Sequence, residues 1–269
     1  MRFVTFDAGH GPRAGVLRDG DRVVEAGRSL RDLIAVDRLA ESPDAEEIPL
    51  SEVQLLPPIP NPDKIICIGL NYLAHAKESG VEPFDTPTFF AKFRNALVPD
   101  GSEVPLPAAS EKVDYEAEVA FVIGKRAKEV SEADALDYIA GYMLLNDLSA
   151  RDLQFATPQW IPGKVFDGAA PCGPWLVTPD EAGAHDAIAF ELKLNGEVMQ
   201  SSTTEDLIFS VPVLLAHLST LMTLEPGDIV STGTPAGVGS GRVPRVWLKP
   251  GDQIEINSPT LGTLRTALI

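Results

Sequence analysis

The chain has 269 residues, of which 44% are hydrophobic and 23% are charged. These values are ordinary for a globular protein, and they exclude collagen-like, coiled-coil and disordered chains. The 39 acidic residues outnumber the 22 basic ones, which gives a formal net charge of −17. Because nucleic acids and anionic membranes attract clustered positive charge, this balance argues against both as partners. We expect most of the carboxylates to lie on a solvated surface.

The cysteines and the amino-terminal segment bear on the compartment. Cys67 and Cys172 stand in apolar or Gly/Pro-rich surroundings and outside any CxxC pair, so neither a disulfide framework nor a thiolate zinc site is expected. The amino-terminal segment contains no long apolar stretch of the kind found in secretory signals. No apolar run approaches the ~20 residues that a membrane helix needs. We therefore expect a cytoplasmic protein.

Residues 1–56 are predicted to form a small, separate α/β domain. Its strands and helix are expected at residues 1–6, 21–26 and 29–41, from β-branched apolar runs followed by helical spacing. Four prolines between residues 57 and 62 then remove backbone donors and favour extended chain. We interpret this stretch as the boundary before a second domain, residues 57–269.

The second domain shows many short apolar strands and few helices. The clearest strand patterns cover 64–70, 113–124 and 141–146, and a helix is expected over 71–80 with Asn71 as its N-cap. The longest helix is expected to run to about Leu221. Regular βαβ alternation is missing, so the pattern predicts a β-rich α+β fold and argues against a doubly wound parallel sheet.

Acidic residues occupy one face of the strand predicted at 113–124. Side chains alternate between the two faces of a strand, so Asp114, Glu116 and Glu118 share a face while the opposite face is apolar. Three like charges in a row repel one another. Two explanations remain open at this point: the face is solvated, or a divalent cation binds neighbouring carboxylates.

Asp147 is a further unusual carboxylate, because it ends an apolar strand just before a helical turn that Ser149 is positioned to cap. A carboxylate at the end of a buried strand needs a charged partner or a metal, although an Asp that shapes the turn fits the same position. Oxygen ligands from Glu116, Glu118 and Asp147, without His or Cys, suit Mg²⁺ or Mn²⁺ first and Ca²⁺ next.

His75 and Glu78 stand three residues apart in the helix predicted over 71–80, which places them side by side. A carboxylate beside an imidazole orients the ring, as in a general base that takes a proton from water. A surface ion pair has the same spacing, so the pair alone does not choose between these interpretations.

Arg151 and Gln154 share a helix face, and Lys164 follows in a Gly-rich turn. Each is a surface group by default. Three carboxylates and one divalent cation sum to −1, however, so an anionic substrate at that site would need additional cations close by. Arginine offers a bidentate fork for a carboxylate, and lysine offers a point charge. The Gly/Thr-rich loop 231–239 lacks the Walker ending, yet its N–H groups are suited to holding a carboxylate.

Six stretches together resemble the fumarylacetoacetate hydrolase family. They are CIGLNYLAHAKE, VDYEAEVAFVIG, GYMLLNDLSARDLQ, GKVFDGAAPCGPWLVT, LKLNGEVMQSSTTEDLIFSVPVLL and LEPGDIVSTGTPAGVG. They follow the family's order over most of residues 64–269, and residues 1–56 resemble the short N-terminal domain of bacterial members. The resemblance implies a mixed β-sandwich roll and a homodimer.

The resemblance also implies roles for particular residues. Glu116, Glu118 and Asp147 match the family's ligands for Mg²⁺ or Mn²⁺. His75 and Glu78 match the catalytic dyad, which orients and deprotonates water.

Other matches concern the substrate. Arg151, Gln154 and Lys164 match positions that line the substrate and metal site, where the two cations stabilise developing negative charge. Thr234 matches a residue that contacts the substrate carboxylate. Asp114 is not among the usual ligands and is expected to be a neighbour of the site.

One segment departs from the family's pattern. Many relatives carry FxKPxxA between the dyad helix and the Glu-x-Glu strand, whereas Phe93, Arg94 and Asn95 stand here after Lys92. In the family this segment often shapes specificity, so the usual substrates do not carry over directly to this chain.

These observations predict a metal-dependent hydrolase that cleaves a C–C bond in a small anionic β-diketo acid of the acylpyruvate or fumarylpyruvate type. His75, oriented by Glu78, would activate the water. An oxaloacetate-type decarboxylase and a 2-hydroxymuconate-type isomerase or lyase are alternatives, because they use the same enolate chemistry. A non-catalytic keto-acid or metal-binding protein is a remote alternative, against which the intact His75–Glu78 pair argues.

Overall fold

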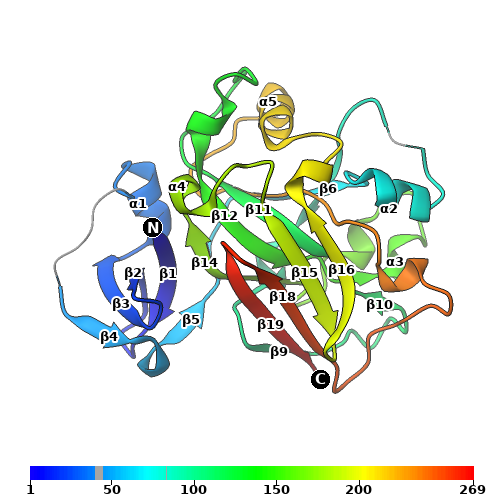
Figure 1. Cartoon of the computed structure of the whole chain (residues 1–269), viewed down its shortest axis with the longest axis horizontal. Coiled ribbons are helices and arrows are strands. Elements are labelled where there is room, and N and C mark those ends of the chain that lie inside the picture. Colours follow the sequence, from blue (N-terminus) through cyan, green and yellow to red (C-terminus); the bar gives the residue numbers. More distant parts are fainter. Residues whose placement is uncertain (40–44, 83) are drawn as a thin grey trace.

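The computed structural model describes residues 1–39, 45–82 and 84–269 and consists mainly of β-sheet (Figure 1). The largest sheet has twelve strands: β1 (Arg2–Asp7), β2 (Pro12–Arg18), β3 (Arg22–Gly27), β4 (Glu47–Pro49), β5 (Gln54–Leu56), β6 (Ile65–Gly69), β7 (Thr88–Lys92), β8 (Leu97–Val98), β11 (Ala117–Ile123), β12 (Ile139–Asn146), β14 (Ala170–Val177) and β17 (Ile229–Ser231). Their order is β4-β3-β2-β1-β14-β12-β11-β17-β6-β7, with β5 beside β1 and β8 beside β14.

A second sheet packs on the first. Its order is β16-β15-β18-β19-β9, and its members are β9 (Ser102–Val104), β15 (Ala189–Leu194), β16 (Glu197–Thr203), β18 (Gln253–Ser258) and β19 (Gly262–Leu268). Contacts of β15, β18 and β19 with β11, β12 and β14 join the two sheets, as Figure 1 shows. A short pair, β10 (Val113–Asp114) with β13 (Ser149–Ala150), lies beside them. The β-rich α+β fold predicted from the sequence is confirmed.

The helices are short. They are α1 (Leu30–Ala35), α2 (Leu73–Glu78), α3 (Arg151–Gln154), α4 (Pro179–Ala182) and α5 (Val211–Leu221), with 3₁₀ turns between them. The end of α5 agrees with the sequence prediction. No helix in the described part of the chain is long and apolar enough to cross a membrane.

Three details of the predicted helices differ. The first helix ends at Ala35, before the expected residue 41, which itself lies outside the described residues. The N-cap of α2 is Tyr72, because the Asn71 side chain is used elsewhere: its amide donates to the Phe209 and Thr232 carbonyls. The N-cap of α3 is Ala150, since the Ser149 hydroxyl donates to the Asp147 carbonyl instead.

The amino-terminal strands continue the large sheet. Strand β1 pairs with β2 and β5 and also runs antiparallel to β14, with Phe3 opposite Leu176. A small second core of Val4, Phe6, Leu17 and Val23 lies on this side. The unit predicted as separate shares its sheet with the rest of the chain, and Phe3, Ala14 and Val16 belong to the main core. Strand β5 ends at Leu56, and the domain boundary after residue 56 stays a prediction.

Both faces of β11 are buried. The acidic face predicted at 113–124 is therefore not a solvated one, and of the two open explanations the wet face is wrong. Strand β11 runs antiparallel to β12, with Ala117 opposite Asn146. The strand predicted over 113–124 is divided in the structure into β10 and β11, and Glu116 directly precedes β11. The register brings Glu116 and Glu118 to the end of β12, where Asp147 follows.

Candidate active site

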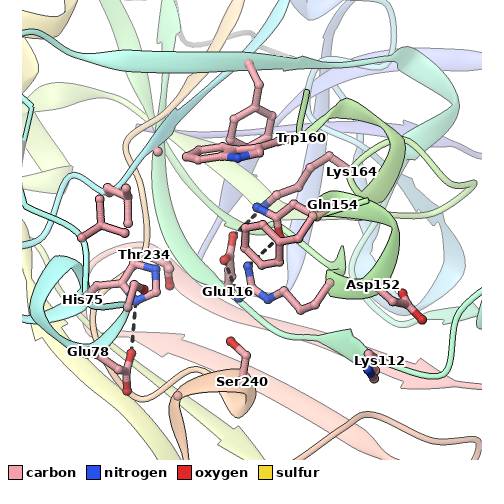
Figure 2. A pocket seen from close by; sticks show the side chains of 18 of the residues that line it. His75, Glu78, Lys112, Glu116, Asp152, Gln154, Trp160, Lys164, Thr234 and Ser240 are labelled. Atoms are coloured by element: carbon pink, nitrogen blue, oxygen red, sulfur yellow. Dashed lines mark hydrogen bonds and ion pairs between the residues drawn. The ribbon is translucent and has the colours of Figure 1, made fainter. Parts of the chain in front are cut away.

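All nine residues selected from the sequence meet in one place. Eight of them line a pocket with a cavity volume of about 490 Å³ at this end of β11 and β12 (Figure 2). The ninth, Asp147, lies behind the pocket wall and is 0% exposed. The eight are His75, Glu78, Glu116, Glu118, Arg151, Gln154, Lys164 and Thr234.

The carboxylates of Glu116, Glu118 and Asp147 form a buried triad. One oxygen of each lies within 4.8 Å of the others. Backbone bonds fix this arrangement locally, because the Asp147 amide donates to the Glu116 carbonyl at 2.8 Å. The Glu116 amide in turn donates to the Asn146 side chain at 3.1 Å. The convergence predicted for the three acids is therefore a consequence of the β11–β12 register.

Two cations neutralise Glu116. Arg151 Nη2 lies 2.6 Å from one of its oxygens, and Lys164 Nζ lies 2.7 Å from the other and 2.8 Å from Asp147 Oδ2. Burial alone would raise the pKa of Glu116, but these two cations outweigh it and hold the pKa below its ordinary value. Arg151 and Lys164 are thus part of the carboxylate cluster and are not surface groups.

Glu118 is the exception within the triad. It accepts hydrogen bonds from the Ser231 hydroxyl at 2.5 Å and the Gly233 amide at 3.0 Å, but no lysine or arginine among the described residues forms an ion pair with it. Burial, with the neighbouring Asp147 and Glu116 carboxylates, raises its pKa well above the ordinary value.

This donor set fits a divalent cation. The ligand atoms are carboxylate oxygens only, as hard cations prefer. Four buried carboxylates face three buried cations, which leaves a formal charge of −1 that a divalent ion would turn into +1. The carboxylates are those of Asp114, Glu116, Glu118 and Asp147, and the cations are Lys92, Arg151 and Lys164.

His75 and Glu78 form the expected pair. His75 Nδ1 lies 3.1 Å from Glu78 Oε2, and the imidazole is 6% exposed. The other Glu78 oxygen accepts the Gly237 amide at 3.0 Å, which fixes the carboxylate from behind. Gly241 packs so closely that a Cβ there would lie 2.4 Å from Glu78 Cδ. Figure 2 shows this pair across the pocket from Lys164 and Gln154.

Asp114 holds Arg151 in place. Its Oδ2 lies 2.9 Å from both Nε and Nη2 of Arg151, while Nη1 of Arg151 donates to Gln154 at 3.0 Å. The Gly239 and Ser240 amides also donate to Asp114, at 2.7 and 3.0 Å. Asp114 is therefore a neighbour of the carboxylate triad, as expected, and it connects Arg151 to the loop behind Glu78.

Thr234 lines the pocket, but its hydroxyl is already occupied. The hydroxyl donates to the Ala117 carbonyl at 2.9 Å and accepts from the Gln200 amide at 2.8 Å. A contact from this hydroxyl proton to a substrate carboxylate therefore requires it to leave Ala117.

Lys92 is a buried part of the site that the sequence reasoning did not select. Its Nζ lies 2.7 Å from Asp147 Oδ1 and donates to the carbonyls of Leu148, Lys164 and Ala169 at 3.2, 2.6 and 2.9 Å. The signal was available, because strand alternation places Lys92 on the same side of β7 as the buried Phe90. A lysine on an apolar strand face needs oxygen partners.

Comparison with known families identifies the chain. Residues 64–269 match the family described as fumarylacetoacetate (FAA) hydrolase C-terminal, and residues 1–58 match one described as Rv2993c-like, N-terminal. The protein belongs to the fumarylacetoacetate hydrolase family, which confirms the resemblance seen in the sequence.

Similar proteins point to keto-acid chemistry. The human oxaloacetate tautomerase FAHD2A, a mitochondrial protein, is 40% identical over 233 residues, which cover 86% of this chain and 74% of that protein. A 5-carboxymethyl-2-hydroxymuconate delta-isomerase from Mycobacterium smegmatis has a similar structure, with 32% identity, a TM-score of 0.85 and coverage of 100% and 99%. A maleylpyruvate hydrolase from Sphingobium sp. SYK-6 shares 30% identity and a TM-score of 0.82, with coverage of 100% and 99%.

Proposed function

We propose that this protein is a divalent-metal-dependent enzyme that interconverts the keto and enol forms of a small 2-oxo acid, with oxaloacetate as the first candidate. The observation that carries the proposal is that one pocket joins an oxygen-only carboxylate triad to the His75–Glu78 pair. The similarity to oxaloacetate tautomerases supports the choice of this reaction over the hydrolysis predicted first from the sequence.

Glu116, Glu118 and Asp147 would hold the metal, Mg²⁺ or Mn²⁺ before Ca²⁺. When bound, the ion supplies a Lewis acid that polarises the 2-oxo group and stabilises negative charge on its oxygen. Lys164 and Arg151 add fixed positive charge beside the same carboxylates, at 2.6–2.8 Å. Preorganised charge of this kind favours an enolate-like transition state.

His75 would move the proton. Conversion of keto oxaloacetate to its enol removes a proton from C3 and places one on the C2 oxygen. Glu78 lies 3.1 Å from Nδ1, which favours the tautomer with the proton on Nδ1 and leaves the Nε2 lone pair as the base. His75 would take the C3 proton and return it to C3 when the reaction runs backwards, and solvent water would supply the proton that the C2 oxygen receives and accept the one that His75 carries. Gln154 and Thr234 line the pocket around the substrate.

Hydrolysis of an acylpyruvate or fumarylpyruvate is the second candidate. The cavity of about 490 Å³ exceeds the volume of a four-carbon acid and has room for a water beside a longer substrate. In this reaction His75 would take a proton from water, which attacks the distal carbonyl. The similar structure of a maleylpyruvate hydrolase supports this candidate. Decarboxylation and isomerisation would use the same enolate-stabilising charges.

The proposal is tested by following the enol absorbance of oxaloacetate with Mg²⁺, Mn²⁺ or EDTA. Tautomerisation should accelerate with either metal and fall to the buffer rate with EDTA or in Glu116→Ala. His75→Ala should lose the metal-dependent rate while still binding the ion. Full activity of Glu116→Ala in EDTA would contradict the metal assignment.

A substrate panel separates the candidates. Acetylpyruvate and oxaloacetate are incubated with the wild-type protein and His75→Ala, with Mg²⁺ present, and pyruvate, acetate and carbon dioxide are quantified. Turnover of oxaloacetate between its two forms without acetate from acetylpyruvate supports the tautomerase. Acetate release that depends on His75 favours the hydrolase.

We also propose that the protein is a cytoplasmic homodimer. The homodimer is supported by the resemblance to the family, and the location by the two free, buried cysteines, which suit a reducing compartment. Light scattering on the purified chain and fractionation of the source cells test these two points.

A further inference from the structure

Two cations at the outer part of the pocket have no carboxylate partner. Lys112 and Arg245 both line the cavity and are both exposed. Within the described part of the chain, neither side chain has an ion pair or a hydrogen bond. In a protein with a net charge of −17, these two cations place positive charge at the cavity.

The backbone connects both residues to the same strand. Lys112 immediately precedes β10, and its carbonyl accepts the Arg151 amide at 2.9 Å. The segment after Arg245 joins the same strand, because the Leu248 amide donates to the Val113 carbonyl at 2.9 Å. The positions of both residues are therefore tied to the β10 strand beside the metal-binding triad.

The other basic groups near the cavity are already committed. Arg151 and Lys164 are 7% and 2% exposed and bind the triad and Asp114. Arg242 uses its guanidinium on the Met199 and Gly237 carbonyls. This contrast leaves the outer pair, Lys112 and Arg245, as the cations that remain available to a ligand.

The acidic neighbour at this end is also occupied. Asp152 accepts the Ser110 hydroxyl at 2.5 Å and the amides of Glu111 and Leu153 at 3.2 and 3.0 Å. Within the described residues, Asp152 forms no ion pair with Lys112. Figure 2 places Lys112 and Asp152 across the pocket from His75 and Glu78. The end of the cavity away from the His75–Glu78 pair therefore carries charged side chains.

We propose that Lys112 and Arg245 form a subsite for the distal carboxylate of a dianionic 2-oxo acid. This inference rests on the proposed function, because it assumes that the 2-oxo carboxylate end lies at the triad. The chain would then select 2-oxo dicarboxylates over 2-oxo monocarboxylates of the same length. An exposed charged contact of this kind contributes about two- to fivefold in affinity for each cation.

Binding is measured first, by calorimetry on the Mg²⁺-loaded protein. The ligands are 2-oxoglutarate and 2-oxovalerate, which have the same chain length and differ in the distal carboxylate. Lys112→Met/Arg245→Met should reduce the preference for 2-oxoglutarate by roughly fourfold or more and leave 2-oxovalerate binding as it was. The matched control is Lys125→Met/Arg126→Met, which removes two exposed positive charges outside this cavity and should preserve the preference.

An unchanged preference in the Lys112/Arg245 variant would overturn the subsite. Equal weakening of both ligands would also overturn it, because that result indicates general electrostatic attraction and not recognition of one group. In the oxaloacetate assay, the loss in kcat/KM of the variant should appear as a higher KM.

The two hypotheses fail in distinguishable ways. If the wild-type protein does not turn over oxaloacetate but the binding preference depends on Lys112 and Arg245, the proposed reaction is wrong and the subsite stands. If oxaloacetate is turned over and the variant has the wild-type KM, the reaction stands and the subsite is wrong.

Discussion

Glu118 is a buried carboxylate whose surroundings suit a bound cation but reduce the stability of the protein without one. It is 1% exposed and next to two other carboxylates, and its hydrogen-bond partners, the Ser231 hydroxyl and the Gly233 amide, are neutral. A buried charge without an opposite charge is costly, which is why its pKa is raised. A bound cation would remove this cost, so the same side chain would couple metal binding to folding stability.

Glu118→Gln should therefore have opposite effects in the two conditions. In EDTA the variant should unfold at a temperature roughly 2 °C or more above the wild type, because the amide keeps an acceptor for Ser231 and removes the charge. With Mn²⁺ the wild type should gain stability and the variant should not. Calorimetric melting with and without Mn²⁺ measures both. Glu103→Gln, on the exposed side of β9, is the control and should behave as the wild type; a lower melting temperature of Glu118→Gln in EDTA would contradict the argument.

Lys92 supports the site with its buried ammonium group. This group binds the Asp147 carboxylate and the carbonyls of Leu148, Lys164 and Ala169. Lys92→Met keeps much of the side-chain volume and leaves all four oxygens without this partner. We expect a loss of about 3 kcal/mol or more in the free energy of unfolding, together with weaker Mn²⁺ binding.

Urea unfolding and Mn²⁺ titration followed by electron paramagnetic resonance check this expectation for Lys92→Met. Lys128→Met is the matched control, because the exposed Lys128 donates to one carbonyl, that of Thr220 at 3.1 Å. Its loss should stay within about 0.5 kcal/mol. Equal losses in the two variants would rule out a special role for Lys92.

At the scale of elements, the segment after β17 supports the site from behind. Gly237 donates to Glu78, while Gly239 and Ser240 donate to Asp114. One loop thereby sets the positions of the carboxylate that orients His75 and of the carboxylate that holds Arg151. The sequence showed this loop as Gly/Thr-rich, and we interpreted it as able to hold a carboxylate; the structure shows that the carboxylates it holds belong to the protein itself.

Gly241→Ala tests the dependence of the dyad on this loop. A Cβ at this position would lie 2.6 Å from Glu78 Oε1, so the flexible Glu78 side chain must move away. We expect kcat for oxaloacetate to fall at least tenfold, because His75 loses its oriented partner, while Mn²⁺ affinity is retained. Gly27→Ala is the control. A Cβ at Gly27 would lie 3.4 Å from the nearest atom, Leu33 Cδ2, and Gly27 lies outside the pocket. Loss of Mn²⁺ binding in Gly241→Ala would instead indicate a general collapse of the site.

At the scale of the whole molecule, the amino-terminal unit is part of the architecture. Strand β1 pairs with β14, and β14 pairs with β12, which precedes Asp147 directly. The twelve-stranded sheet thus extends without interruption from the amino-terminal strands to the site. Removing these strands would leave β14 with an unpaired edge.

A chain of residues 57–269 should therefore be less soluble than the full chain, because an exposed strand edge pairs with other molecules. Size-exclusion chromatography with light scattering is expected to show larger species at concentrations where the full chain gives one species. Adding residues 1–56 as a separate polypeptide should restore the smaller form. If the shortened chain has the same size and solubility as the full chain, the two units are independent.

Local spacing allowed much of the site to be predicted. Strand alternation placed Asp114, Glu116 and Glu118 on one face, and helical spacing placed His75 beside Glu78, because both relations depend on backbone geometry within a few residues. The resemblance to the family indicated that these residues, although far apart in the sequence, belong to one site. Helix ends and N-caps were predicted less accurately. The Asn71 side chain donates to carbonyls far away in the sequence, and the Ser149 hydroxyl donates to the Asp147 carbonyl in the turn, so neither residue caps a helix.

Composition and local pattern by themselves determined the β-rich class, the shared acidic face and the His–Glu pair. Tertiary structure decided whether that acidic face is wet or buried, and which carboxylate has which cation. Glu116 meets Lys164 across 48 residues and Glu118 meets Ser231 across 113, so no local period encodes these contacts. The physical reason is that burial and ion pairing depend on which strands lie side by side, and only the folded sheet sets that order.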